Sequence, residues 1–334
     1  MQLNEIIDFI EDPQTTEELC RRANELRHEI HGNEVHLRGI VEFSNYCDAS
    51  CRYCGLNKHR KDLHRYMLSW DELISRAVEV ADMGFKTLVL QSGQHRGLEV
   101  QGLADAVTQI KKQRDVKITL SCGEWPTDVY KLWKDAGADR YLLKLETADA
   151  DLYQTLHPHM SHANRRRCLE DMFKLGYQVG SGNLVGLPGQ TSKHLALDIL
   201  DFAEYPYDMI SVGPLIPSEH TDLADMQPPP IDLALRVIAL ARLHAAEAHM
   251  PTTTALCSIS KEARVQALLS GANVVMISFT PKSVVGDYNI YEKSACGSTE
   301  NCLSCTKKVF ENLGLKVAKG HGEGIRNKRE GQNA

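Results

Sequence analysis

Residues 34–55 read EVHLRGIVEFSNYCDASCRYCG, and this stretch gives the first indication of the fold. Its first ten residues are rich in β-branched and apolar side chains, which favours a β-strand. The following loop carries three closely spaced cysteines, Cys47, Cys51 and Cys54. Beyond the loop, a serine followed by two acidic residues is typical of a helix start, so we expect a helix over 69–83.

This order of strand then helix repeats along the chain. Eight apolar segments of strand length alternate with segments of helical period, and the connections are short, as in a parallel sheet. Eight units within 34–278 predict an α/β fold, a complete (βα)₈ TIM barrel, with a doubly wound open sheet as the alternative. The expected strands are 34–43, 86–91, 116–121, 139–145, 177–186, 208–213, 252–257 and 273–278, and the expected helices are 69–83, 100–113, 126–136, 164–175, 192–203, 231–249 and 261–270.

The barrel divides the chain into three parts. We expect residues 1–33 to form a helical cap over one barrel end, 34–280 to form the barrel, and 281–334 to form an extension that closes it. The tail after Leu315 is rich in Gly, Lys and Arg and is expected to be mobile. Functional residues of such barrels lie on loops after the C-terminal strand ends, which is where the cysteine loop falls.

Composition narrows the class of protein. The 334 residues are 43% hydrophobic, enough for a large core, and the net charge of −6 argues against a nucleic-acid binder. The N-terminus lacks the pattern of a signal peptide, and no apolar run reaches the ~20 residues of a membrane span. We therefore expect a cytoplasmic protein without nucleic-acid or membrane partners. Ten cysteines in a reducing compartment, six of them in two groups, indicate metal ligands rather than disulfides.

The first cysteine group has the spacing C-x₃-C-x₂-C. Three thiolates at this spacing can bind three corners of one 4Fe–4S cluster and leave the fourth iron open to a small molecule. A zinc site is the alternative, and it would need a fourth ligand such as His59 or His64.

This spacing, with an aromatic residue (Tyr53) before the third cysteine, resembles the radical S-adenosylmethionine (SAM) family. The resemblance implies that SAM binds the open iron and is cleaved to a 5′-deoxyadenosyl radical. It also implies that a glycine-rich turn, here Ser92 and Gly93, holds the SAM amino group. Many relatives have an acid where this chain has Gln94, so a side-chain contact there is in doubt.

Further cofactor contacts are expected after the fourth strand. Lys144 and Glu146 alternate onto the same side of the chain, where a carboxylate can accept hydrogen bonds from the ribose and a cation can pair with the SAM carboxylate. A buried structural Lys–Glu pair is the alternative. Arg165 matches the place of a family arginine that pairs with the SAM carboxylate, and solvated surface is its alternative.

Several longer strings resemble one branch closely, the HydE family of FeFe-hydrogenase maturases. Methylornithine and biotin synthases fit these strings less well, and a HydE-like paralogue acting on another small amino-acid-like compound remains open. The departures are Lys144 in place of arginine, and Gln94. The matching strings are CGL (54–56), RY (65–66), VLQSG (89–93), GEWP (123–126), AGADRYLL (136–143), GLPGQT (186–191) and GANVVM (271–276).

The HydE resemblance implies a small thiol or cysteine-derived substrate inside the barrel. Thr253 and Thr254 would offer hydroxyl contacts, and Tyr288 and Tyr291 would act as catalytic donors of a proton, hydrogen atom or hydrogen bond. For the tyrosines, packing is the alternative. The implied partners are an electron donor such as ferredoxin or flavodoxin, and other hydrogenase maturases.

A second cysteine group, Cys296, Cys302 and Cys305, lies beyond the barrel. It predicts an accessory iron–sulfur cluster, with zinc or no metal as the alternative. A different class of function is a non-catalytic iron–sulfur scaffold or electron carrier. A tRNA- or protein-modifying enzyme would need a basic docking face or an added domain, which the acidic composition does not favour.

Overall fold

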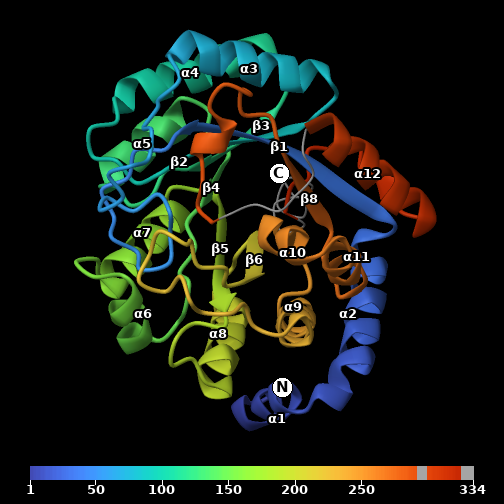
Figure 1. Cartoon of the computed structure of the whole chain (residues 1–334). Helices are drawn as coiled ribbons and strands as arrows, with labels where there is room; N and C mark the ends of the chain where they lie inside the picture. The colour runs from blue at the N-terminus through green and yellow to red at the C-terminus, as the bar shows by residue number, and fades with distance from the viewer. Residues whose placement is uncertain (292–298, 325–334) are drawn as a thin grey trace.

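The computed structural model describes residues 1–291 and 299–324, and eight parallel strands form its centre (Figure 1). The hydrogen-bonded order is β6-β5-β4-β3-β2-β1-β8-β7, and an isolated parallel bridge between Met209 and His249 links the two ends. The first and last barrel strands, β1 and β8, are therefore neighbours, which confirms a nearly closed barrel and rules out the open sheet. The strands are β1 Glu34–Ser44, β2 Thr87–Ser92, β3 Lys117–Ser121, β4 Arg140–Leu142, β5 Gln178–Val185, β6 Met209–Pro214, β7 Pro251–Thr252 and β8 Val274–Ser278.

Helices form an outer layer around the strands (Figure 1). The start of α3 is explained by the local sequence. The Ser69 hydroxyl accepts from the Glu72 backbone N–H at 3.3 Å, and the Glu72 carboxylate accepts from the Ser69 backbone N–H at 2.8 Å, which together form a capping box. None of the described helices is long and apolar enough to cross a membrane. The helices of the ring are α3 Trp70–Asp82, α4 Val100–Gln113, α5 Thr127–Asp135, α6 Ala150–Leu156, α7 His162–Lys174, α8 Ser192–Glu204, α9 Ile231–His244 and α11 Lys261–Leu269.

The predicted seventh strand is wrong over most of its length. Strand β7 ends at Thr252, and the chain turns at Thr253 into a short helix, α10 (Thr254–Ile259). Three consecutive β-branched threonines favour a strand locally, but Ala255 and Leu256 favour a helix, and both are buried. The turn places Thr253 and Thr254 at the barrel mouth.

The N-terminal residues form two helices, α1 (Leu3–Glu11) and α2 (Thr16–His31). They pack along the outer face of α8 and α9 instead of covering a barrel end. Ile6 and Ile10 of α1 are fully buried in this contact, and Arg236 of α9 donates to the Ile10 carbonyl at 3.1 Å. The three-part division of the chain stays an interpretation.

The chain after Leu315 is bound to the barrel as far as it is described, so the expectation of a mobile tail from this point is wrong. After α12 (Thr299–Asn312), a two-residue strand β9 (Lys316–Val317) pairs with the start of β1. The Arg140 guanidinium then donates to the carbonyls of His321 and Gly322, both at 2.8 Å. Because Arg140 lies at the start of β4, residues 318–324 cross the N-terminal end of the barrel.

Replacing Arg140 with methionine is expected to lower the free energy of unfolding by about 3–5 kcal/mol, because several buried acceptors lose their hydrogen-bond donor. The side chain is fully buried and also donates to Gln178 and Thr87, at 2.7 and 3.0 Å. Urea unfolding measures the loss. Arg21→Met on the exposed face of α2 is the control and should leave the urea midpoint nearly unchanged, and equal losses in the two variants would contradict the buried role of Arg140.

Candidate active site

The cysteine loop leaves the C-terminal end of β1, as expected from the sequence. Burial raises the pKa of the Cys51 thiol well above its usual range, and the neighbouring thiols of Cys54 and Cys47 raise it further. Burial likewise raises the pKa of Cys54 to about 12. The three thiols therefore lie near enough to interact electrostatically. Among the described residues, no three His, Cys, Asp or Glu side chains converge on a single-ion site.

Arg65 holds the cysteine loop in shape, a role that was not predicted from the sequence. Its guanidinium donates to the backbone carbonyls of Asn45, Leu56 and Asn57, at 2.6, 2.9 and 2.8 Å. Three carbonyls on both sides of the cysteines are thereby tied to one side chain.

The end of β2 lies directly against the cysteine loop. A Cβ atom on Gly93 would stand 2.3 Å from the Tyr46 carbonyl oxygen and 2.7 Å from Cβ of Cys47, so only glycine fits. The backbone N–H of Asp48 donates to the Gln94 carbonyl at 2.6 Å. Ser92 turns its hydroxyl onto the Gly93 carbonyl at 2.8 Å. The structure thus brings Ser92 and Gly93 to the cysteine loop, while the Gln94 side chain accepts from the backbone of Glu124.

Glu146 has a strained backbone, with φ of +71°. Its carboxylate pairs with Lys144 at 3.0 Å, so the two side chains do lie on the same side. The Oε2 atom nonetheless has no partner of hydrogen-bond geometry among the described residues, although it is buried. Buried Asp198 secures the turn by accepting from Thr147 and from the Ala148 backbone, at 3.2 and 2.6 Å. A strained, incompletely bonded carboxylate at a strand end is typical of a ligand contact.

Arg165 is buried, which excludes the alternative of solvated surface. Its Nε lies 2.8 Å from Glu124 and 3.1 Å from the Tyr153 hydroxyl, and Nη1 donates to the Lys144 carbonyl at 3.3 Å. Glu124 follows β3 and belongs to the GEWP string (123–126), but no role was predicted for it from the sequence. Its Oε1 has no hydrogen-bond partner among the described residues despite this ion pair. The geometry is therefore that of a charge contact.

Three of the four predicted substrate and catalytic residues make side-chain hydrogen bonds near the mouth, where the segment carrying the two tyrosines also contacts the cysteine loop: the Gly55 backbone N–H donates to the Ile290 carbonyl at 2.7 Å. Gln91 donates to the Tyr288 hydroxyl at 3.0 Å, and the hydroxyls of Thr254 and Tyr291 lie 2.6 Å apart. Burial raises the pKa of both tyrosines, that of Tyr291 to about 12, so each keeps its proton at neutral pH. The buried Thr253 hydroxyl has no hydrogen-bond partner within the described part of the chain.

Arg38 is a buried cation inside the barrel that sequence patterns did not reveal. Its neighbour Gly39 faces the helices, since a Cβ there would lie 2.4 Å from Val80, and alternation turns Arg38 inward. Nη1 reaches Sδ of Met209 on β6 at 2.8 Å, while Nε and Nη2 have no hydrogen-bond partner among the described residues. Burial and the charge of Arg140 lower the pKa of Arg38. Two unused donors on a buried guanidinium fit an anionic group in the barrel.

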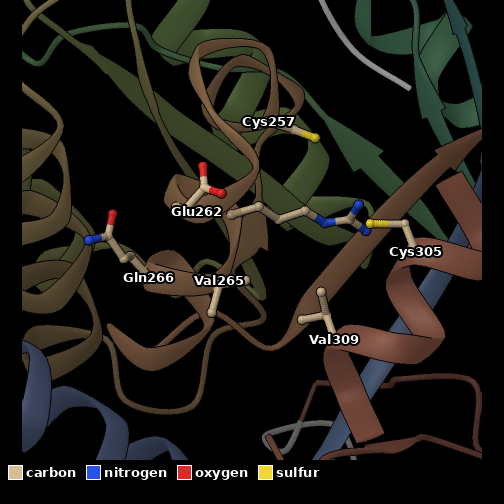
Figure 2. Close-up of a pocket in the computed structure, with 7 residues that line it drawn as sticks. Cys257, Glu262, Val265, Gln266, Cys305 and Val309 are labelled. Carbon is tan, nitrogen blue, oxygen red and sulfur yellow. The ribbon is translucent and has the colours of Figure 1, made fainter. Parts of the chain in front are cut away.

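The second cysteine group is only partly described, because Cys296 lies outside the described residues. Cys302 and Cys305 are three residues apart on α12, and Arg264 approaches the Cys302 sulfur at 3.8 Å. Figure 2 shows a pocket of about 240 Å³ near this helix, lined by Cys257 of α10 and Cys305 among others.

Comparison with known proteins first identifies the class of enzyme. The chain matches the Radical SAM superfamily over residues 41–203, which include the cysteine loop, Gly93, Glu146 and Arg165. The three clustered thiols, the glycine-only approach and the incompletely bonded Glu146 fit the 4Fe–4S cluster and SAM that this class uses. The chain is a radical SAM enzyme, so the zinc site and the non-catalytic scaffold are set aside.

The particular family follows from a second comparison. The chain is 41% identical over 315 residues to the FeFe hydrogenase maturase subunit HydE of Thermotoga maritima, covering 94% of this chain and 90% of that protein. It belongs to the HydE family. Methylornithine synthase (PylB) has a similar structure, with a TM-score of 0.83 at 23% identity and coverage of 95% and 94%. The maturase HydG has a TM-score of 0.81 at 19% identity, covering 96% of this chain and 73% of HydG. The two structures support the fold alone.

Proposed function

We propose that this enzyme acts in assembly of the di-iron site of FeFe hydrogenase, on a small thiol or cysteine-derived substrate held inside the barrel. The main support for this proposal is that the cysteine loop, Arg165 and Glu146 come together at the mouth of the barrel. The Cys51 thiol lies close enough to Arg165 and Glu146 for both charges to act on its pKa. Deeper in the barrel, beside Met209 at the start of β6, Arg38 has two nitrogens without hydrogen-bond partners among the described residues, which suits an anionic group of a substrate that extends down from the mouth.

The proposal gives each predicted residue a role. Bound cluster and SAM supply one-electron cleavage of SAM to methionine and a 5′-deoxyadenosyl radical. Arg165 pairs with the SAM carboxylate, and Glu146 accepts from the ribose hydroxyls. The residues assigned to the cluster are Cys47, Cys51 and Cys54, and those assigned to SAM are Tyr53, Ser92, Gly93, Lys144, Glu146 and Arg165.

On the substrate side, Thr253 and Thr254 offer hydroxyls, and protonated Tyr288 and Tyr291 donate a hydrogen bond, proton or hydrogen atom. Cys302 and Cys305, with Cys296, hold an accessory cluster. Ferredoxin or flavodoxin supplies electrons, and other hydrogenase maturases are partners. The cysteine content supports a reducing, cytoplasmic setting.

Complementation tests the maturation role. The gene is expressed in a host that produces FeFe hydrogenase but lacks its own HydE, and hydrogenase activity is measured. Restored activity with the wild type, and none with Cys51→Ser, is the expected result. If the wild type cleaves SAM but restores no activity, the chain is a HydE-like paralogue acting on another small substrate, which the departures at Lys144 and Gln94 would then explain.

Replacing Arg165 with glutamine is expected to raise KM for SAM by about 30-fold or more, because a buried charge contact to SAM is lost and Glu124 loses its ion-pair partner. Initial rates of 5′-deoxyadenosine formation against SAM concentration measure the change. Arg167→Gln on the same helix is the control, since Arg167 pairs with Asp171 at 2.6 Å and its side chain is 42% exposed. A KM for Arg165→Gln equal to that of the control would contradict the assigned role.

A further inference from the structure

His157 is a buried imidazole that touches the cluster loop. It caps α6 and is 1% exposed, and its Nε2 lies 2.9 Å from the hydroxyl of Tyr53, the residue just before Cys54. The two rings meet edge to face, with centroids 5.6 Å apart. No role was predicted for His157, because a single histidine after a helix forms no recognisable motif.

The direction of this hydrogen bond follows from the other ring nitrogen. Nδ1 lies 3.0 Å from the backbone carbonyl of Tyr153, which can only accept, so Nδ1 carries the proton. Burial, followed by the charge of Arg165, lowers the pKa of His157 to about 4, so the ring is neutral at neutral pH. Nε2 is therefore a bare acceptor, and the Tyr53 hydroxyl donates to it.

The same segment holds the neighbouring part of the cluster loop. The Ser50 hydroxyl donates to the Pro158 carbonyl at 2.7 Å, and the Arg52 backbone N–H donates to the Leu156 carbonyl at 3.0 Å. On the other side of the loop, the Ser218 backbone N–H donates to the Tyr53 carbonyl at 3.0 Å. The backbone of the loop is thus fixed independently, and the His157 ring acts on the Tyr53 side chain.

His157 also connects Tyr53 to the arginine of the site. Its ring stacks on Tyr153, with centroids 4.2 Å apart and planes 25° apart. The Tyr153 hydroxyl in turn lies 3.1 Å from Nε of Arg165. A continuous row of direct contacts therefore runs from the cluster loop to the guanidinium.

We propose that His157 is a positioning residue for SAM binding: as a neutral acceptor it fixes the Tyr53 side chain beside the cluster and aligns it with Arg165. This inference rests on the proposed role of the mouth as a SAM site. Without the acceptor, the Tyr53 hydroxyl loses its buried partner and the ring is free to turn. SAM must then order the ring on binding, which weakens binding.

The test compares His157→Phe, Tyr53→Phe and the double variant. Loss of one buried hydrogen bond is expected to raise KM for SAM about tenfold in each, with a smaller change in kcat. Because both substitutions remove the same contact, the double variant should be no worse than the single ones. His157→Gln, whose side-chain oxygen can accept from Tyr53, should restore KM. The electron paramagnetic resonance signal of the reduced cluster should shift on adding SAM at higher concentration in His157→Phe than in the wild type.

His162→Phe is the matched control, because His162 also packs on the Tyr153 ring, with centroids 5.4 Å apart, but lies on α7 and makes no hydrogen bond to the cysteine loop within the described part of the chain. It should leave KM unchanged. Urea unfolding of the cluster-free variants gives a readout independent of activity: the midpoint shifts of Tyr53→Phe and His157→Phe should not add in the double variant. Additive effects on KM and on the midpoints, or an unchanged KM in His157→Phe, would overturn the inference. If the wild type itself did not cleave SAM, the proposed function would fail, while the unfolding data would still decide whether the two residues are coupled.

Discussion

Replacing Cys51 with serine is expected to lower the rate of 5′-deoxyadenosine formation by about three orders of magnitude or more, because catalytic parts that act as a unit fail together. Cys51 is the middle thiol of the loop, and burial together with its two neighbouring thiols raises its pKa well above the usual range. That environment opposes a free thiolate and favours one bound to iron, which replaces the proton. Iron content after anaerobic reconstitution and product formation by chromatography measure the loss.

Cys305→Ser is the matched control for this experiment. Cys305 lies on α12, outside the cysteine loop to which the proposal assigns SAM cleavage. The variant should keep SAM cleavage and lose only the iron of the second site. Normal iron content and normal cleavage in Cys51→Ser would show that the first cysteine group does not hold the working cluster.

Replacing Arg38 with methionine is expected to separate stability from function. Without substrate, the buried guanidinium leaves two donors without hydrogen bonds among the described residues, so an apolar side chain of similar length should raise the free energy of unfolding by about 1–4 kcal/mol. Hydrogenase activation should fall by about 30-fold or more, since the substrate carboxylate loses its charge partner. Urea unfolding and the complementation assay measure the two effects.

Arg236→Met provides the contrast for Arg38. Arg236 is equally buried, but it donates to the Ile10 carbonyl at 3.1 Å and to the Thr16 hydroxyl at 2.8 Å. Its replacement should lower the free energy of unfolding by about 1–3 kcal/mol and leave SAM cleavage intact. A loss of stability in Arg38→Met similar to that in Arg236→Met would show that Arg38 is a satisfied structural residue and not a substrate contact.

Sequence patterns predicted the elements whose signals are local and periodic. The strand and helix alternation gave the barrel, and the C-x₃-C-x₂-C spacing at the end of its first strand gave the site. The prediction of the seventh strand was wrong because Thr252–Thr254 has strand propensity, while the mouth of the barrel requires a turn there. The bound C-terminal segment was not predicted for a similar reason. Its Gly- and Lys-rich sequence is typical of a mobile tail, and the donors that Arg140 supplies to its carbonyls come from a distant part of the chain.

Residues defined by long-range contacts could not be predicted. Glu124 and His157 lie in loops, and each becomes significant only when another segment is brought to it: Arg165 for the first and Tyr53 for the second. Arg38 is one of several polar residues in its strand, and only the contacts of its neighbour Gly39 with the helix layer show that Arg38 faces the barrel interior. In each case the informative observation is a buried polar atom and its partner, which requires three-dimensional structure.

The central claim, that the three cysteines hold a cluster that cleaves SAM, has one direct test. Anaerobically reconstituted protein is reduced with dithionite and mixed with SAM, and 5′-deoxyadenosine and methionine are measured together. Formation of both products in equal amounts, dependent on the cluster and lost in Cys51→Ser, is the predicted result. A fully loaded, reduced cluster that leaves SAM intact would contradict the account and make the chain an iron–sulfur scaffold.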